Sequence, residues 1–176
     1  MGFLTGWRVC PRCGGDLANK ESQAECRACG SVYYAQSAPA ASALVVDDGG
    51  RVLLARRAFE PDAGLWDLVG GFLEEGESPL DGMRREVLEE TSVEVEPGAF
   101  LGSFLDTYGE GDDAASILNL VWEARIVSGE PRPADDVAEL RWFPLDALPE
   151  PEELAFRWVA PFLAEVASAR SLPSTP

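Results

Sequence analysis

The feature that most constrains this 176-residue chain is the charged segment between Gly71 and Val93. Glu86, Glu89 and Glu90 are separated by three and four positions, a spacing that places them on one face of an α-helix. Three carboxylates on one face repel each other unless a cation lies between them, and oxygen ligands grouped in this way suit Mg²⁺ or Mn²⁺. The alternative is a solvated helix face with ion pairs at i,i+4 spacing.

The boundaries of this helix are also marked in the sequence. Ser78 is the expected N-cap, Pro79 suits the first helical position, and Asp81 complements the positive helix end. We expect the helix to end at Glu90 or Thr91. The apolar positions that repeat on its other face are Leu80, Met83 and Val87.

The composition narrows the chemistry further. Because the chain contains no histidine, a general base must be a carboxylate or a metal-bound hydroxide, and a serine–histidine triad is excluded. The formal net charge of −17 repels a duplex or a long RNA unless a basic patch or metal ions offset it. Divalent cations can bridge carboxylates to small phosphate-bearing molecules, so small anionic substrates fit this composition.

The chain has four cysteines, all in its first thirty residues, arranged as two CxxC pairs that are each followed by glycine. Paired motifs of this kind hold one Zn²⁺ in a tetrahedron of thiolates, and Gly14 and Gly30 allow the tight turns beneath the metal. A structural zinc ribbon is therefore predicted, with redox-active dithiols or disulfides as the alternatives. The expected ligands are Cys10, Cys13, Cys26 and Cys29.

Composition divides the chain into a zinc ribbon over residues 1–34, a linker over 35–42, a main domain over 43–170 and a disordered tail over 171–176. The first residues lack the apolar run of an export signal, and no stretch reaches the roughly 20 apolar residues of a membrane span. A cytoplasmic protein is expected.

The main domain reads as a mixture of strands and helices. Two apolar runs within 43–57 flank the turn Asp47–Gly50, which predicts a hairpin. A shorter strand is expected over 65–72 and a closing helix over 152–169, interrupted near Pro161. Three further strands are expected over 93–107, 116–127 and 140–143. The fold class is α+β, a mixed sandwich.

The segment from Gly71 resembles the Nudix box: glycine, five residues, Glu77, seven residues, then Arg-Glu-Val-Leu-Glu-Glu. The resemblance extends over most of residues 43–165. It implies a Nudix α/β/α sandwich with a mixed sheet, preceded here by the small Cys₄ ribbon. The implied reaction is attack of a metal-activated water on phosphorus in a diphosphate.

The resemblance also implies roles for individual residues. Glu86, Glu89 and Glu90 match the metal-binding glutamates, and Gly71 lies where a backbone carbonyl commonly helps to bind the metal. The pair that orients the loop against the helix corresponds to Arg85 and Glu77.

Two positions depart from the family pattern. Ser92 replaces the usual glycine at the helix C-terminus, and Val69 replaces the proline that often precedes the double glycine. A later loop often supplies another carboxylate, for which Asp136 is the first candidate and Glu139 the second; either is alternatively a solvated group. The residues 110–113 are expected to form an exposed turn; alternatively, they lie over the site.

A zinc ribbon followed by this domain resembles NADH pyrophosphatases and a related group acting on ADP-ribose or FAD. The Ser-Gln-Pro-Trp array of the NADH enzymes is absent from the corresponding stretch, Gly102–Tyr108, so ADP-ribose is favoured over NADH. Two alternatives stay open. One is a catalytically silent nucleotide sensor whose ribbon binds nucleic acid; the other is a decapping enzyme for nucleotide-capped RNA, which the acidity and the lack of a Lys/Arg cluster disfavour. Homodimers are common among relatives.

Five residues are candidates for substrate contacts. Arg56 and Arg57 suit a phosphate or, alternatively, a surface carboxylate. Trp66, Phe104 and Tyr108 suit stacking on a base or, alternatively, packing within the sheet.

Overall fold

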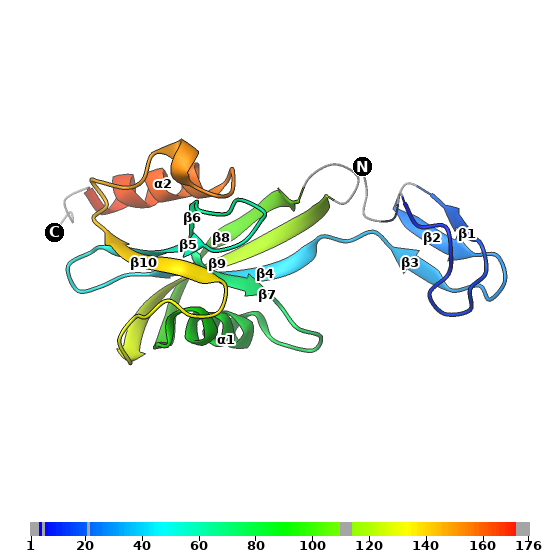
Figure 1. The fold of residues 1–176 in the computed structure, drawn as a ribbon, viewed down its shortest axis with the longest axis horizontal. Helices are drawn as coiled ribbons and strands as arrows, with labels where there is room; N and C mark the ends of the chain where they lie inside the picture. Colours follow the sequence, from blue (N-terminus) through cyan, green and yellow to red (C-terminus); the bar gives the residue numbers. More distant parts are fainter. Residues whose placement is uncertain (1–3, 5, 21, 110–113, 172–176) are drawn as a thin grey trace. The chain divides into compact units, whose positions relative to one another are not determined.

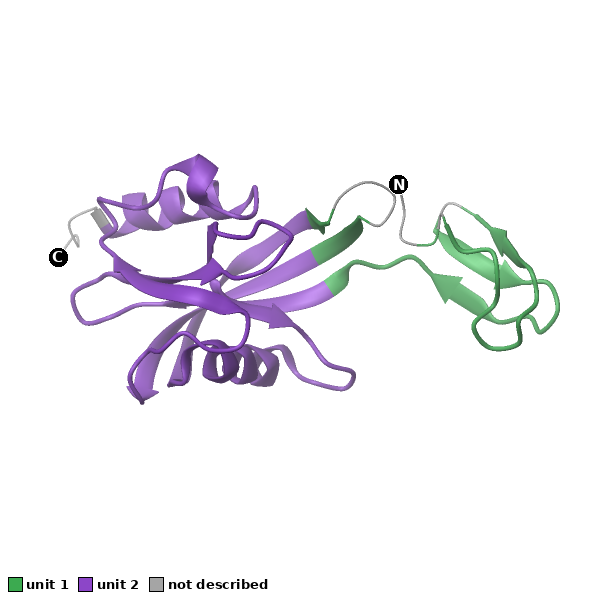
Figure 2. Cartoon of the chain, viewed as in Figure 1, with its two compact units in different colours: residues 1–38, 107–117 green, residues 39–106, 118–176 purple. Residues whose placement is uncertain are grey.

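The computed structural model describes residues 4, 6–20, 22–109 and 114–171. Its chain divides into two compact units, shown in different colours in Figure 2. One unit comprises residues 1–38 and 107–117, and the other comprises residues 39–106 and 118–176. The predicted turn over 110–113 and most of the predicted tail lie outside the described residues.

The first unit contains a small antiparallel sheet that carries the cysteine motifs. Its strands are β1 (Leu17–Asn19), β2 (Gln23–Cys26) and β3 (Val32–Tyr34), in the order β1-β2-β3. Gly14 and Gly30, which follow the two CxxC pairs, have φ angles of 75° and 73°. These left-handed conformations confirm the expected tight turns, since glycine adopts them without steric cost.

The larger unit contains two sheets. The four-stranded sheet has the order β7-β4-β9-β8, and the three-stranded sheet has the order β10-β5-β6. The strands are β4 (Ala38–Val45), β5 (Val52–Arg57), β6 (Trp66–Asp67), β7 (Val69–Phe72), β8 (Glu94–Tyr108), β9 (Ala115–Ser128) and β10 (Val137–Phe143). The helices are α1 (Pro79–Thr91), the short 3₁₀ helix η2 (Pro151–Glu153) and α2 (Val159–Ser171).

The strands of the larger unit lie between α1 and α2, which confirms the predicted α/β/α arrangement (Figure 1). Because successive side chains of a strand point to opposite faces, β4 and β5 serve two cores. Ala43 and Leu53 join the hydrophobic cluster that includes Met83 and Val87 of α1. Their neighbours, such as Leu44 and Leu54, join the cluster that includes Val159 and Leu163 of α2. Strands buried on both faces explain the nearly continuous apolar runs in the sequence.

The predicted hairpin over 43–57 is wrong, although its turn is present. The Asp47 N–H donates to the Arg51 carbonyl at 3.0 Å, and an isolated bridge joins Val46 to Val52. Beyond that bridge, β4 pairs with β7 and β9, whereas β5 pairs with β10 and β6. The two apolar runs separate because each is buried on both faces and so belongs inside a sheet of its own.

Three other boundaries differ from the predictions. The expected strand over 65–72 is divided at Leu68 into β6 and β7, which belong to different sheets. The closing helix is broken between η2 and α2, and Pro161 lies in the first turn of α2, where its missing N–H costs no helical hydrogen bond. β10 begins at Val137 rather than Leu140.

The predicted linker over 35–42 is corrected in its second half, because β4 already begins at Ala38. The small residues there pair with the glycine-rich strand β7, and a large side chain would not fit so readily at that pairing. Ser42, for example, faces Gly70 in the antiparallel register. Among the described residues, no helix combines the length and the apolar character that a membrane crossing requires.

Candidate metal and substrate site

The helix α1 begins and ends as its sequence predicts. The Ser78 side chain accepts a hydrogen bond from the Asp81 N–H at 3.3 Å, and Pro79 is the first helical residue. At the other end, Ser92 adopts the left-handed conformation with φ 60°, and its N–H donates to the Leu88 carbonyl. These caps fix where the helix begins and ends, and the burial of Met83 and Val87 in the core fixes which face carries its carboxylates.

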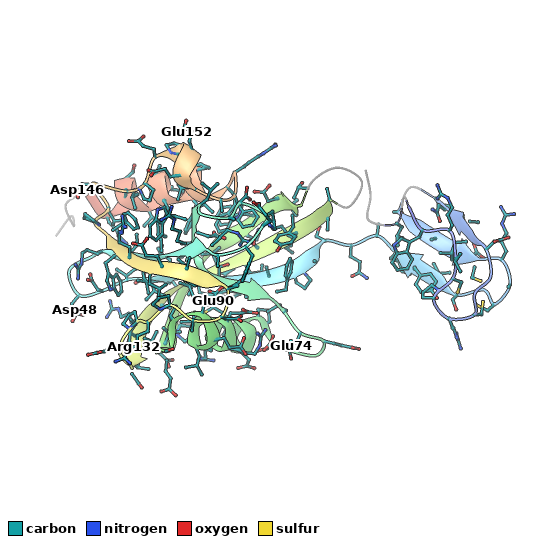
Figure 3. All side chains as sticks on the ribbon, viewed as in Figure 1. Asp48, Glu74, Glu90, Arg132, Asp146 and Glu152 are labelled. Carbon is teal, nitrogen blue, oxygen red and sulfur yellow. The ribbon has the colours of Figure 1, made fainter. Side chains whose placement is uncertain are left out.

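The three glutamates of α1 differ in exposure. Glu90 is buried, with 8% of its surface accessible, and its carboxylate accepts the Gly70 N–H at 2.9 Å. Glu86 is 16% exposed in its side chain, whereas Glu89 is 49% exposed. Figure 3 shows Glu90 between α1 and the strands. The carboxylates therefore extend from the helix–sheet interface to the surface.

Arg85 connects this helix to the loop before it. Its guanidinium donates two hydrogen bonds to Glu77, both at 2.9 Å, and one to the Phe72 carbonyl at 3.1 Å. It also donates to Glu86 at 2.8 Å and to Glu89 at 3.0 Å. The hydrogen bonds from Arg85 lower the pKa of Glu77 to about 2. This geometry supports the predicted role of Arg85 and Glu77 in orienting the loop.

Gly71 lies directly against the carboxylate of Glu86. A Cβ atom at position 71 would lie 2.5 to 2.7 Å from the three atoms of that carboxylate, closer than real Cβ atoms approach. The neighbouring Gly70 has φ 147° and passes so close to β4 that a Cβ atom there would lie 2.4 Å from the Ala41 carbonyl oxygen. Gly70 is thus required by the close approach of the β4 backbone, whereas an added Cβ atom at position 71 would displace the Glu86 carboxylate.

The electrostatics of these carboxylates favour a cation between them. Burial is the largest cause that raises the pKa of Glu86, and the negative charges of Glu89 and Asp136 raise it further. Burial also raises the pKa of Glu90 well above its ordinary value, together with the charges of Asp136 and Glu86. A divalent cation would offset this repulsion, and carboxylate oxygens are the donors that Mg²⁺ and Mn²⁺ prefer. The residues present therefore fit such an ion.

A small cavity of about 20 Å³ adjoins Glu90. It has room for one water molecule or one ion. Three carboxyl groups and one guanidinium line it, together with apolar and backbone atoms. The lining residues are Ala55, Arg57, Asp67, Leu68, Gly70, Glu90, Asp136 and Val137.

Asp136 reaches this cavity because its loop is tied to the end of α1. The Arg132 N–H donates to the Thr91 carbonyl at 2.9 Å, and the Ala134 N–H donates to the Glu90 carbonyl at 3.0 Å. The Asp136 carbonyl in turn accepts the Ala58 N–H at 2.8 Å. These bonds satisfy carbonyls that the helix end leaves open, and they fix Asp136 close to Glu90.

Glu139, the second candidate for the additional carboxylate, lies elsewhere. Its side chain pairs with Arg56 at 3.5 Å and accepts hydrogen bonds from Arg141. A bulge between Val137 and Glu139 shifts the pairing of β10 with β5. Glu139 is not among the cavity-lining residues, so the geometry favours Asp136 as the additional carboxylate.

Arg56 and Arg57 point in different directions, as successive residues of a strand do. The Arg57 side chain is 18% exposed and lines the cavity. Arg56 is 47% exposed, donates to the Gly64 carbonyl at 2.8 Å and pairs with Glu139. Arg57 is therefore the better placed of the two for a phosphate near the glutamates.

The aromatic candidates are mainly packed inside the domain. Trp66 is 6% exposed and meets Phe143 edge to face, with ring centroids 5.0 Å apart. Phe104 stacks on Trp158 at 4.7 Å. For these two rings the packing alternative describes the contacts, and stacking on a base is not supported. Tyr108 is half-buried.

Asp67 is a residue of the site that the sequence analysis missed. It follows Trp66 in β6, lines the cavity, and accepts the Leu68 N–H at 2.7 Å. Burial raises the pKa of Asp67 to about 7, against the opposing effect of Arg57. A carboxylate between two large apolar residues, in the sequence Trp-Asp-Leu, was the available signal, because charged residues are rarely buried without a partner.

The four cysteines of the ribbon are free thiols that lie close together. Their Sγ atoms are all within 4.8 Å of one another. The Cys10–Cys29 separation is 3.8 Å and the Cys13–Cys26 separation is 3.5 Å. Four sulfurs at the usual zinc–sulfur distance in a tetrahedron are about 3.8 Å apart, so this cluster is compatible with one zinc ion.

Comparison with known proteins identifies the family of the chain. The profile of the NUDIX domain family matches residues 36–166, and the chain belongs to this family. A crystal structure of a NUDIX hydrolase from Nitrosomonas europaea matches with a TM-score of 0.76 over 97% of both chains. At 23% identity, that likeness is one of fold.

Two curated relatives show the range of names within the family. A protein named NAD-capped RNA hydrolase NudC, from Stutzerimonas stutzeri (strain A1501), is 32% identical over 175 residues. That match spans 97% of this chain and 59% of the relative. A protein named ADP-ribose pyrophosphatase, from Methanocaldococcus jannaschii, is 29% identical over 106 residues, 60% of this chain and 62% of the relative. The chain thus matches less than two thirds of either relative's length.

Proposed function

We propose that this protein hydrolyses the diphosphate bond of a nucleoside diphosphate linked to another moiety, with ADP-ribose as the favoured substrate and NADH or FAD as further candidates. The observation that carries this proposal is the carboxylate group of α1. Glu86 and Glu90 both have raised pKa values, and the Glu86 carboxylate occupies the space that a Cβ atom at position 71 would take.

Glu86, Glu89, Glu90 and the Gly71 carbonyl are the proposed ligands of Mg²⁺ or Mn²⁺. When bound, such an ion would activate a water molecule for attack on phosphorus and would offset negative charge on the phosphate oxygens. Asp136 adds a carboxylate beside Glu90 and is the candidate to accept the proton of that water, since the chain has no histidine. Arg85 keeps Glu86 and Glu89 oriented, and Arg57 faces the substrate's phosphate.

Turnover of a substrate panel tests this function. ADP-ribose, NADH, FAD, diadenosine polyphosphates and NAD-capped RNA would be incubated with Mg²⁺ or Mn²⁺, and products separated by chromatography. In Glu89→Gln we expect turnover to fall by more than about 100-fold, because even partners of metal ligands cost about 10- to 100-fold when removed. Glu94→Gln, an exposed carboxylate of β8, is the matched control and should retain full activity. Metal-independent turnover, or an active Glu89→Gln variant, would contradict the proposal.

NAD-capped RNA is a second candidate substrate, because the relative that matches 97% of this chain is named for that activity. The acidity of the chain opposes it. RNA with a 5′ NAD cap would be compared with free NADH at rising salt concentrations. Cap removal that is faster than NADH cleavage and weakens with salt would support the RNA substrate. Tight nucleotide binding without any turnover would instead support the sensor.

The remaining predictions concern the structural metal, the cellular location and the oligomeric state. A structural zinc in the Cys₄ ribbon is proposed on the sulfur separations and the donor chemistry. The cytoplasmic location and the homodimer stay predictions.

A further inference from the structure

The guanidinium of Arg57 is held from three sides. Its Nε donates to the Pro61 carbonyl at 2.8 Å, its Nη1 lies 3.8 Å from an oxygen of Asp67, and its Cζ lies 5.5 Å from the centre of the Phe156 ring. Only 18% of the side chain is exposed. A surface arginine usually samples many rotamers, whereas these contacts restrict the Arg57 side chain to few of them before any substrate binds.

Asp67 holds Arg57 without taking all of its donors. One Asp67 oxygen accepts the Leu68 N–H at 2.7 Å, and the other faces Arg57 at 3.8 Å, which is an ion pair too long for a direct hydrogen bond. A guanidinium has five N–H donors. Within the described part of the chain its hydrogen bond goes to Pro61, so most of these donors stay open to a ligand.

The position of Asp67 also determines which carboxylate Arg57 meets. Glu90 and Asp136 line the same cavity as Arg57, and a guanidinium free to move would be attracted to them. Pairing with Glu90 would occupy a proposed metal ligand, and pairing with Asp136 would occupy the proposed proton acceptor. Asp67, on the neighbouring strand β6, offers Arg57 a carboxyl group that is not one of the proposed metal ligands. The raised pKa of Asp67 agrees with its burial in this wall.

We propose that Asp67 is a positioning residue that holds the Arg57 guanidinium at the cavity wall, where Arg57 binds a phosphate of the substrate's diphosphate. Arginine suits this task because its planar fork of donors matches two phosphate oxygens at once. Asp67 acts through Arg57 and does not contact the substrate. The inference rests on the proposed function, since it names how the same site binds the diphosphate.

A double-mutant cycle tests this inference. Asp67→Asn and Arg57→Ala are each expected to raise KM for ADP-ribose about tenfold, with kcat changed by less than about twofold, as for a contact made equally in ground and transition states. In the Arg57→Ala background, Asp67→Asn should have no further effect, because residues that act through one another are not additive. Glu123→Gln is the matched control, since it removes the carboxylate of another half-buried pair, with Arg170 at 2.7 Å.

A second variant guards against misfolding. If Asp67→Asn does not fold by circular dichroism, Asp67→Glu replaces it, because the charge is kept while the carboxylate moves by one methylene group. KM should again rise, by less than in the asparagine variant, and again only when Arg57 is present. Additive effects of the two positions, or a fall in kcat at unchanged KM, would overturn the inference.

Equilibrium binding separates this inference from the proposed function. ADP-ribose binding to Glu89→Gln and to Glu89→Gln/Asp67→Asn would be measured by calorimetry, with a tenfold weaker dissociation constant expected in the double variant. If the wild type binds but does not turn over ADP-ribose, the proposed function fails while this weakening still supports the role of Asp67. The inference is overturned if the two variants have equal dissociation constants for ADP-ribose, or if Glu89→Gln does not bind ADP-ribose at all. Either result counts whether or not the wild type turns over ADP-ribose.

Discussion

At the scale of single residues, the contact between Gly71 and Glu86 is the most sensitive point of the site. In Gly71→Ala, the new Cβ would lie within 2.7 Å of the Glu86 carboxylate and displace it. We expect metal-dependent turnover to fall about 100-fold, the loss typical of a misplacement of about 1 Å. Gly98→Ala is the control, since a Cβ there would make ordinary contacts, the nearest at 3.5 Å. Steady-state kinetics measure both, and unchanged activity in Gly71→Ala would refute the predicted contact.

A second prediction at this scale concerns Asp67 and the pH dependence of the free energy of unfolding. Its folded pKa of about 7 is above the ordinary value of 3.8, so the folded state binds the proton more tightly than the unfolded state. The stability from this group is therefore complete below about pH 3.8 and is lost as the pH rises to about 7. From pH 5 to pH 8, the wild type should lose about 2 kcal/mol relative to Asp67→Asn.

Urea unfolding in EDTA, followed by tryptophan fluorescence, measures this difference. Four of the five tryptophans lie in residues 39–176, so the signal comes mainly from the unit that contains Asp67. The comparison needs only the change with pH, because the fixed cost of leaving Arg57 unpaired is the same at both pH values. A wild type that gains stability relative to the variant at high pH would contradict the raised pKa.

The spacing of the box predicted Gly71, Glu77 and the Arg85 helix, and the structure brings them together. The spacing left Asp136 and Glu139 as alternatives, since the choice depends on the path of the loop that ends before β10 and on the bulge between Val137 and Glu139. For the aromatic candidates, the sequence left packing and stacking open as alternatives. An aromatic residue in a strand has a face that sequence does not reveal, and Trp66 proved to face the core.

At the scale of elements, α1 depends on a left-handed residue at its end. Ser92 has φ 60°, a conformation that costs a residue with a Cβ roughly 1 kcal/mol relative to glycine. Ser92→Gly should therefore raise the free energy of unfolding by up to about 1 kcal/mol, measured by urea unfolding. Ser103→Gly, in the strand β8, is the control and should destabilise, because glycine weakens a strand interior. Equal changes in both variants would show that the cap is not strained.

The elements themselves were predicted better than their partners. The limits of α1, β8 and β9 agree with the sequence within about one residue, since caps and turn residues are local signals. The partners of β4 and β5 were not predictable in this way. A turn such as Asp47–Gly50 favours a hairpin, but burial of both faces of each strand in separate sheets is a tertiary effect that local chemistry does not encode.

At the scale of the whole molecule, the charge is divided unevenly between the parts of the chain. Residues 1–38 carry four Lys/Arg and three Asp/Glu, whereas residues 39–176 carry ten and 28. The repulsion expected for RNA therefore comes from the domain that contains the glutamates, while the ribbon is nearly neutral. The net charge sums both parts of the chain and does not tell which part an RNA would meet. The salt dependence of cleavage reports the charges that the bound substrate meets, so it distinguishes a nucleotide from a capped RNA better.

The positions of the hydrophobic clusters predict that the ribbon needs zinc to fold and that the larger unit does not. Both hydrophobic clusters consist of residues from Ala41 onward, whereas a segment as short as the ribbon rarely folds without a metal. Purified protein should hold one zinc per chain. After its removal all four cysteines should react with a thiol reagent, while the thermal midpoint of the larger unit shifts by less than about 2 °C.

Circular dichroism of the helices reports the larger unit, since both α1 and α2 belong to it. The variant Cys10→Ser/Cys13→Ser removes half of the ligands without a chelator and should give the same result, with Mg²⁺-dependent turnover retained. If zinc loss instead unfolded the helices in the same transition, the ribbon would be part of the cooperative core of the enzyme. The Cys₄ cluster would then stabilise the glutamate site as well as its own sheet, and the separation into two independently folding units would be wrong.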